Sequence, residues 1–195
     1  MVRKDNITET VIHSLKSDYV LVSDRAKSID FTPFTLFKRG DNFRKLYQWR
    51  IDINGKSLYI ITLDNSYRLN IVQPELDGRV HTNDFKYLYC YYEFKKDFPD
   101  TVIRPNSLAD KLSNSFFHFS IKIKNRPKFN DKYIIESRDK YSILGLLNEN
   151  VISLFEDSSE IIIEIRDKKC LIMSLRSINY EDSNKMIKIV EELMY

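Results

Sequence analysis

Glycine is scarce in this sequence, with only 4 residues among 195. They are far apart in the chain, at Gly40, Gly55, Gly78 and Gly145. A phosphate-cradling loop needs several glycines within a few positions, so no glycine-rich loop for a nucleotide or dinucleotide can form. The short motifs of α/β-hydrolases and zinc proteases are also missing. The common catalytic signatures are therefore absent, and no cofactor is expected.

Cysteine and histidine are few as well, with two cysteines and three histidines. Cys90 and Cys170 each lie inside an apolar run, whereas a small secreted domain held by disulfides would contain more cysteines. Two distant cysteines and scattered histidines cannot form a Cys/His metal centre. We therefore expect two buried thiols in a protein of the bacterial cytoplasm.

Long apolar runs and an excess of one charge are missing too. No segment approaches the ~20 apolar residues that span a bilayer, and no apolar stretch of signal-peptide type follows the N-terminus. The 31 Lys and Arg residues against 28 Asp and Glu residues give a net charge of +3, which is small for a nucleic-acid-binding surface. These absences predict a cytoplasmic protein without a membrane span and without a small-molecule ligand.

Aromatic residues are abundant, with 12 Tyr and 12 Phe, and this composition excludes a disordered chain. A capping pattern predicts a first helix that begins at Asn6 and ends near Ser17. Its expected apolar face consists of Ile7, Val11, Ile12 and Leu15. Asn54-Gly55 between two apolar segments predicts a type I′ hairpin over residues 48–63. The aromatic segment Phe85 to Phe94 predicts a strand covered on both faces, and Thr101 to Arg104 a further short strand.

The second half of the chain shows similarly clear patterns. Phe117 to Lys124 alternates as a strand does, and Lys132 to Ser137 predicts the next strand. A helical stretch from Asp139 or Ser142 to Phe155 contains a break near Asn148. A second hairpin around Asp167-Lys168 precedes an amphipathic helix that starts near Glu181.

Strands and helices are grouped along the chain and do not alternate strictly. The predicted fold class is therefore α+β, a mainly antiparallel sheet with flanking helices that ends in a β-hairpin and an amphipathic C-terminal helix. Residues 1–45 are expected to form an N-terminal helix and a peripheral segment. Residues 46–195 are expected to form a single α+β domain.

Several motifs resemble those of an uncharacterised bacterial domain of unknown function, a soluble domain often found beside transmembrane helices. They are the Tyr-rich strand at 87–94, Val102-Ile103-Arg104-Pro105, Phe129-Asn130 at the start of a strand, Asp139, the hairpin at 161–173 and the closing helix at 184–194. The resemblance implies the same α+β architecture and supplies no catalytic residues. From the residues themselves, Phe129 is expected to fill the core, and Asn130 to tie the preceding turn to the backbone.

Four aromatic residues are the candidates for binding a protein partner: Phe31, Phe34, Phe37 and Trp49. Aromatic residues dominate the energetics of protein interfaces, although packing in the protein's own core is the alternative for each. Our main hypothesis is a non-enzymatic bacterial protein-interaction module, whose partner is another protein or a second copy of the chain.

Two further hypotheses concern charged residues. Lys122, Lys124, Arg126 and Lys128 would share one face of an extended strand and form a basic surface for nucleic acid or another anion. The alternative is that acidic residues of a neighbouring strand pair with them. Asp157, Glu160 and Glu164 could hold Mg²⁺ in a metal-dependent nuclease, with Arg166 in the place of a lysine. Here the alternative is that they are charged residues on the solvated face of a sheet.

Overall fold

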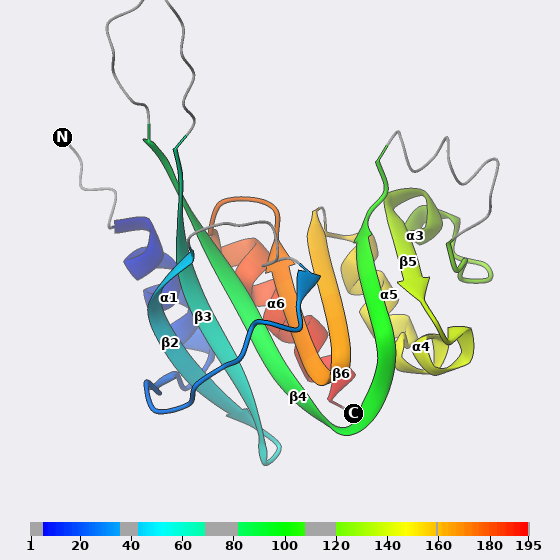
Figure 1. Cartoon of the computed structure of the whole chain (residues 1–195), viewed down its shortest axis with the longest axis horizontal. Coiled ribbons are helices and arrows are strands. Elements are labelled where there is room, and N and C mark those ends of the chain that lie inside the picture. Colours follow the sequence, from blue (N-terminus) through cyan, green and yellow to red (C-terminus); the bar gives the residue numbers. More distant parts are fainter. Residues whose placement is uncertain (1–5, 36–42, 69–81, 108–119, 159, 195) are drawn as a thin grey trace, which may run out of the picture.

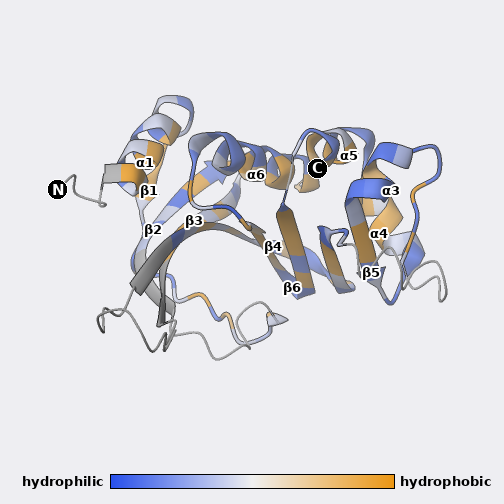
Figure 2. Cartoon of the chain, turned by 90° about the horizontal axis from the view of Figure 1, so that it is seen from above, coloured by the Kyte–Doolittle hydropathy of each residue, from blue (hydrophilic) through white to orange (hydrophobic). Residues whose placement is uncertain are grey.

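The computed structural model describes residues 6–35, 43–68, 82–107, 120–158 and 160–194. Within them, a six-stranded antiparallel sheet carries five helices against one face (Figures 1 and 2). The predicted α+β class is therefore confirmed. The strands are β1 (Val22–Ser23), β2 (Phe43–Ile53), β3 (Lys56–Arg68), β4 (Thr82–Pro105), β5 (Tyr133–Ser137) and β6 (Ile161–Ser174). The helices are α1 (Asn6–Asp18), α3 (Pro127–Lys132), α4 (Lys140–Leu146), α5 (Glu149–Glu156) and α6 (Tyr180–Leu193).

The predicted first hairpin joins β2 to β3. Ile53 pairs with Lys56, and the two turn residues have positive φ, 51° at Asn54 and 73° at Gly55. Asparagine and glycine tolerate this left-handed conformation, and its twist matches that of the paired strands. The Asn-Gly prediction is confirmed.

The long strand β4 bends into a U around β6, which is itself folded into a hairpin (Figure 1). One arm of β4 pairs Tyr89 with Met173, and the other pairs Ile103 with Ile163. Asp167 has a φ of 53° at the tip of β6, and the Leu175 amide donates to the Glu160 carbonyl (2.8 Å) where the hairpin opens. The predicted second hairpin is confirmed, while the two predicted strands at 85–94 and 101–104 are arms of one curved strand.

Side-chain caps fix where the helices begin. The carboxylate of Asp139 accepts from the backbone N–H groups of Tyr141 and Ser142 at the start of α4. The side chain of Asn148 accepts from the Val151 amide (2.9 Å) at the start of α5. The predicted break near Asn148 is thus an N-cap, which satisfies a donor that the helix itself leaves free.

The main core lies between the helices and the sheet. In α1, Val11, Ile12 and Leu15 are buried as expected, but Ile7 is 57% exposed. Thr8 is buried in its place, so the packed face is rotated from the predicted one. The buried face of the predicted C-terminal helix, α6, also lies in this core, with Met186, Ile187, Ile189, Val190 and Leu193.

The Phe129-Asn130 pair lies in α3 and not at the start of a strand as predicted, but it has the two roles expected of it. Phe129 is fully buried, with its ring stacked on Tyr133 at 5.5 Å and edge-on to Phe155 at 5.7 Å. The Asn130 amide accepts from the Ile123 N–H (2.9 Å) and donates to the Ile123 carbonyl (2.8 Å). One side chain therefore satisfies both backbone groups of a loop residue.

An Asn130→Ala substitution is expected to lower the free energy of unfolding by about 1–2 kcal/mol, because two hydrogen bonds to Ile123 are lost. Urea denaturation measures this change, and hydrogen exchange of the Ile123 amide should accelerate. Lys124→Ala, at an exposed position of the same loop, is the control and should leave both quantities nearly unchanged.

Candidate functional site

The sheet face opposite the helices, called the second face below, is also apolar. Its buried residues are Ile61, Leu63, Tyr89, Tyr91, Ile162, Leu171 and Met173, joined by Phe34 from outside the sheet. Successive strand residues point to opposite faces, so Ile60 and Ile172 belong to the helix side while Ile61 and Leu171 belong to the second face. The two-sided burial predicted for the aromatic strand is confirmed.

Residues 24–35, called the strap below, cover the second face. The strap leaves β1 beside β2 and passes in front of the strands toward β6 (Figure 1), on the side away from the helices (Figure 2). Phe34 is fully buried and meets Tyr91 edge-on at 6.4 Å, while Ile29 and Phe31 pack against the same cluster. The strap thus provides the apolar cover that this face needs.

Side chains of β2 hold the first part of the strap. Gln48 is buried, and its amide nitrogen donates to the backbone carbonyls of Asp24 (2.8 Å) and Lys27 (3.1 Å). Arg50 forms an ion pair with the Asp24 carboxylate at 3.5 Å. Because Gln48 binds backbone groups, these two hydrogen bonds do not depend on the side chains of Asp24 and Lys27.

Two ion pairs hold the middle of the strap to β4 and β6. Lys27 lies 3.4 Å from Glu93 and 5.9 Å from the centre of the Tyr59 ring. Asp30 lies 3.0 Å from Lys169. All four charged side chains are at least 30% exposed, so each pair stabilises the strap only weakly.

A buried carboxylate holds the end of the strap. Glu164 in β6 is fully buried, and its Oε1 accepts from the Thr35 backbone N–H (2.7 Å) and from the Thr35 hydroxyl (2.8 Å). Arg166 supplies the counter-charge at 2.6 Å from the same oxygen and lies 3.8 Å from Asp100. A buried charge is tolerated only when it is paired and hydrogen-bonded, so Glu164 and Thr35 depend on each other.

The ionised form of Asp30 is favoured within the strap. Hydrogen bonds from the Thr32 hydroxyl and backbone N–H, with Lys169 as a further contributor, lower the pKa of Asp30 to about 2 from its ordinary 3.8. A carboxyl whose folded-state pKa is lowered contributes stability above its unfolded pKa and loses it as pH falls through the folded value. The anchoring by Asp30 should therefore weaken between about pH 4 and pH 2.

The expected result is that wild-type stability falls more steeply between about pH 4 and pH 2 than that of an Asp30→Asn variant. Urea midpoints of both chains, measured at several pH values, give the difference. Contributions of other carboxylates cancel in this comparison, so parallel curves would contradict the role assigned to Asp30.

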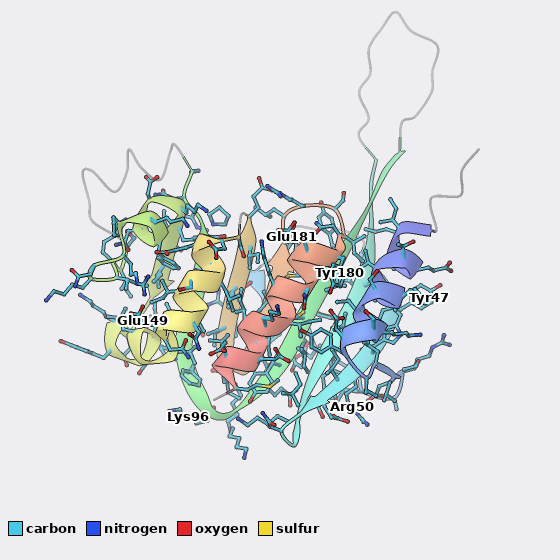
Figure 3. All side chains as sticks on the ribbon, turned by 180° about the vertical axis from the view of Figure 1, so that it is seen from behind. Tyr47, Arg50, Lys96, Glu149, Tyr180 and Glu181 are labelled. Atoms are coloured by element: carbon cyan, nitrogen blue, oxygen red, sulfur yellow. The ribbon has the colours of Figure 1, made fainter. Side chains whose placement is uncertain are left out.

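The four predicted partner-binding aromatics are placed differently from one another. Phe34 and Phe31 belong to the strap, where Phe34 has no exposed surface to offer a second protein. Trp49 is partly buried against the helix-side core and stacks at 5.5 Å on Tyr47, which is 45% exposed beside α1 (Figure 3). Phe37 lies outside the described residues.

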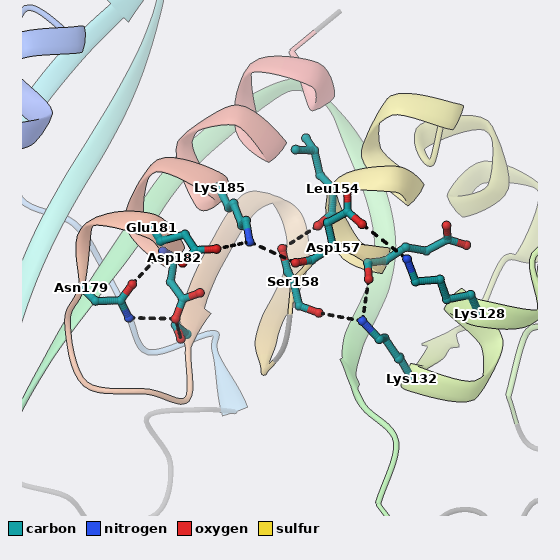
Figure 4. Close-up of polar contacts among 11 residues, drawn as sticks. Lys128, Lys132, Leu154, Asp157, Ser158, Asn179, Glu181, Asp182 and Lys185 are labelled. Carbon is teal, nitrogen blue, oxygen red and sulfur yellow. Dashed lines mark hydrogen bonds and ion pairs between the residues drawn. The ribbon is translucent and has the colours of Figure 1, made fainter.

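The three predicted metal ligands each face a different cation. Asp157 lies 3.4 Å from Lys128, and its backbone carbonyl accepts from Lys185 at 3.0 Å (Figure 4). Glu160 pairs with Arg176 at 3.3 Å, and Glu164 with Arg166. In the part of the chain that the structure describes, no cluster of three or more His, Cys, Asp or Glu residues could hold a metal. The structure thus does not gather these carboxylates into a metal site.

The four predicted anion-binding residues do not lie on one extended strand. The described part of the predicted strand is a loop, in which Ile121 forms a single bridge to Ile135. Lys122 and Lys124 are exposed there, while Arg126 precedes α3 and Lys128 lies within it. Acidic residues pair with two of the four: Glu149 and Glu156 with Arg126, and Asp157 with Lys128. These acids come from α5 and its C-cap, where a neighbouring strand was expected.

Both cysteines are free and fully buried, and burial raises the pKa of Cys90 and of Cys170.

The sequence reasoning missed Gln48 as an anchor, since a glutamine in a strand gives no local signal for a carbonyl partner 21 or 24 residues away. The sequence patterns also suggested a metal ion as the partner of Glu164, whereas its partners in the structure are Thr35 and Arg166. An acid inside an apolar run signals a buried charge, but the pattern does not reveal which donors satisfy it.

Comparisons with known proteins identify a fold. No family model matches the chain, and no curated protein matches it. The crystal structure of the mycobacterial trehalose monomycolate transport factor A, TtfA, is similar in fold, with a TM-score of 0.53 at 7% sequence identity. The similarity covers 96% of this chain and 90% of that one. At this identity the likeness concerns the fold alone.

None of the described helices has the length and apolarity that crossing a membrane requires.

Proposed function

We propose that this protein is a non-enzymatic protein-interaction module whose second sheet face binds a segment of a partner protein. The observation that carries the proposal is the strap itself. A stretch of the chain outside the sheet lies on this face, with the Phe34 side chain fully buried and the backbone carbonyls of Asp24 and Lys27 held by Gln48. In this proposal, the strap occupies the binding face in the place of a partner segment.

The contacts of the strap have the anatomy of a peptide-binding interface. A desolvated aromatic anchor, Phe34, lies near its C-terminal end, and such anchors dominate the energetics of protein interfaces. Exposed ion pairs in its middle, Lys27–Glu93 and Asp30–Lys169, contribute orientation more than affinity. A segment from another protein, or from a second copy of the chain, could satisfy the same groups.

The remaining expectations are part of the same proposal. Two free buried thiols favour a cytoplasmic protein, since oxidising compartments favour disulfides. The bacterial origin, the boundary at residue 45 and the resemblance to an uncharacterised bacterial domain stay predictions. No specific observation favours the nucleic-acid-binding or nuclease alternatives over the interaction module.

Selection from a displayed random-peptide library tests the proposal. The target is the full chain with Phe34→Ala, which weakens the strap, and the wild-type chain is the matched control. We expect peptides with an aromatic residue to be enriched on the variant and displaced by a synthetic peptide of residues 24–35. No enrichment, or binders that the strap peptide does not displace, would refute the proposal.

A further inference from the structure

We infer that the second face selects partner segments in which an acidic residue is followed four positions later by an aromatic residue and then by serine or threonine. This inference rests on the proposed function and names the chemistry of the partner. The three positions correspond to Asp30, Phe34 and Thr35 of the strap, each of which meets a different group of the sheet.

The aromatic position is set by the apolar cluster. Phe34 has no exposed surface, and its ring lies edge-on to Tyr91 at 87°. A smaller side chain at this position would leave a cavity among residues of β3, β4 and β6, because the surrounding strands can collapse only partly. The face therefore requires a large planar side chain here.

The hydroxyl position is set by Glu164. Its Oε1 receives two donors from one strap residue, the N–H and the O–H of Thr35. A valine in place of Thr35 would retain the N–H but remove the O–H, and the buried carboxylate would lose a charge-assisted hydrogen bond. Sites built to bind a hydroxyl reject analogues that lack it, since the buried partner is left short of a donor.

The acidic position is set by Lys169 and by a turn. Asp30 accepts from the Thr32 N–H (3.0 Å) and hydroxyl (2.7 Å), and the Phe34 amide donates to the Phe31 carbonyl (3.1 Å). These bonds close a compact turn whose aromatic residues pack on the face. The Asp30–Lys169 pair is exposed, so the acid supplies a weaker preference than the other two positions.

Fluorescence anisotropy with a labelled peptide of residues 24–35 tests this selectivity on the full-length Phe34→Ala chain. The Phe34→Ala peptide should bind about 100-fold more weakly or worse than the unmodified peptide. Thr35→Val in the peptide should weaken binding about tenfold to a hundredfold. Asp30→Asn should weaken binding no more than about fivefold.

A Ser28→Val peptide is the matched control for Thr35→Val, because it also removes a hydroxyl but at an exposed position. It should bind within about twofold of the unmodified peptide. Circular dichroism confirms that the receptor is folded, and a Thr35→Val chain serves as the receptor if the Phe34→Ala chain is not. Unmodified and Thr35→Val peptides of equal affinity would overturn the inference while leaving the proposed function intact. If no peptide binds a folded receptor at all, both the inference and the proposed function are wrong.

Discussion

Replacing Glu164 by glutamine is expected to lower the free energy of unfolding by about 3 kcal/mol. The carboxylate is fully buried, and its removal leaves Arg166, whose side chain is only 16% exposed, without its nearest counter-charge. Loss of one partner from a buried ion pair typically costs 3–5 kcal/mol, and Asp100 at 3.8 Å from Arg166 places this case at the lower end. Urea denaturation gives the value.

The matched control is Glu160→Gln, four residues earlier in the chain. Glu160 pairs with Arg176, but both side chains are about half exposed, so the expected change is below about 1 kcal/mol. Glu164→Gln should also loosen the strap, and trypsin should cleave after Arg25 and Lys27 faster than in the Glu160→Gln chain. Equal stability and equal proteolysis of the two variants would contradict the role of Glu164 as the strap's buried anchor.

Replacing Phe129 by alanine is expected to cost about 3–5 kcal/mol of stability. The ring is fully buried and contacts Tyr133 and Phe155, so its removal opens a cavity between α3, β5 and α5. Tyr141→Ala is the control, because that ring is 87% exposed and its loss should change stability by less than about 0.5 kcal/mol. Thermal or urea unfolding separates the two outcomes.

Phe129 lies in the helix-side core, whereas the strap lies on the second face. A Phe129→Ala change introduced into the Phe34→Ala receptor, if the double variant stays folded, should therefore leave its affinity for the strap peptide nearly unchanged. A large loss of peptide affinity in a folded double variant would show that the two faces of the sheet are coupled, contrary to this account.

Local patterns predicted most elements of the fold. Such patterns work where a residue interacts with neighbours close to it in the chain. Examples are the Asn54-Gly55 turn, the helix break at Asn148 and the hydrogen bonds of Asn130 to Ile123. The exposure of Ile7 shows where such reasoning fails, since the direction in which a short helix packs depends on the surface beneath it.

The basic strand failed for a reason that was visible in the sequence. Pro127 follows Arg126 directly, and proline is favoured in the first turn of a helix, where α3 indeed begins. The alternate spacing of the four basic residues favours a strand, but the helix that begins at Pro127 interrupts it. An extended strand through Lys128 was therefore the weaker interpretation of the residues present.

The strap could be anticipated only in part. The sequence marked Phe31 and Phe34 as residues that either bind a partner or pack in the core. It gave no sign of the contact between Thr35 and Glu164, which are 129 positions apart. Their pairing follows from the way β6 folds inside the curve of β4, which no local pattern reveals. The candidate site therefore depends on how distant strands are brought together. The sequence alone identified its aromatic residues but not the surface that they cover.

The decisive measurement is a methyl NMR titration of the full-length Phe34→Ala chain with a peptide of residues 24–35. Ile61 and Leu171 face the strap, while their chain neighbours Ile60 and Ile172 face the helices. If the second face binds peptide segments, the methyl signals of Ile61 and Leu171 should shift on addition of the peptide, and those of Ile60 and Ile172 should move far less. Signals that do not shift, or that shift equally on both faces, would contradict a peptide-binding second face.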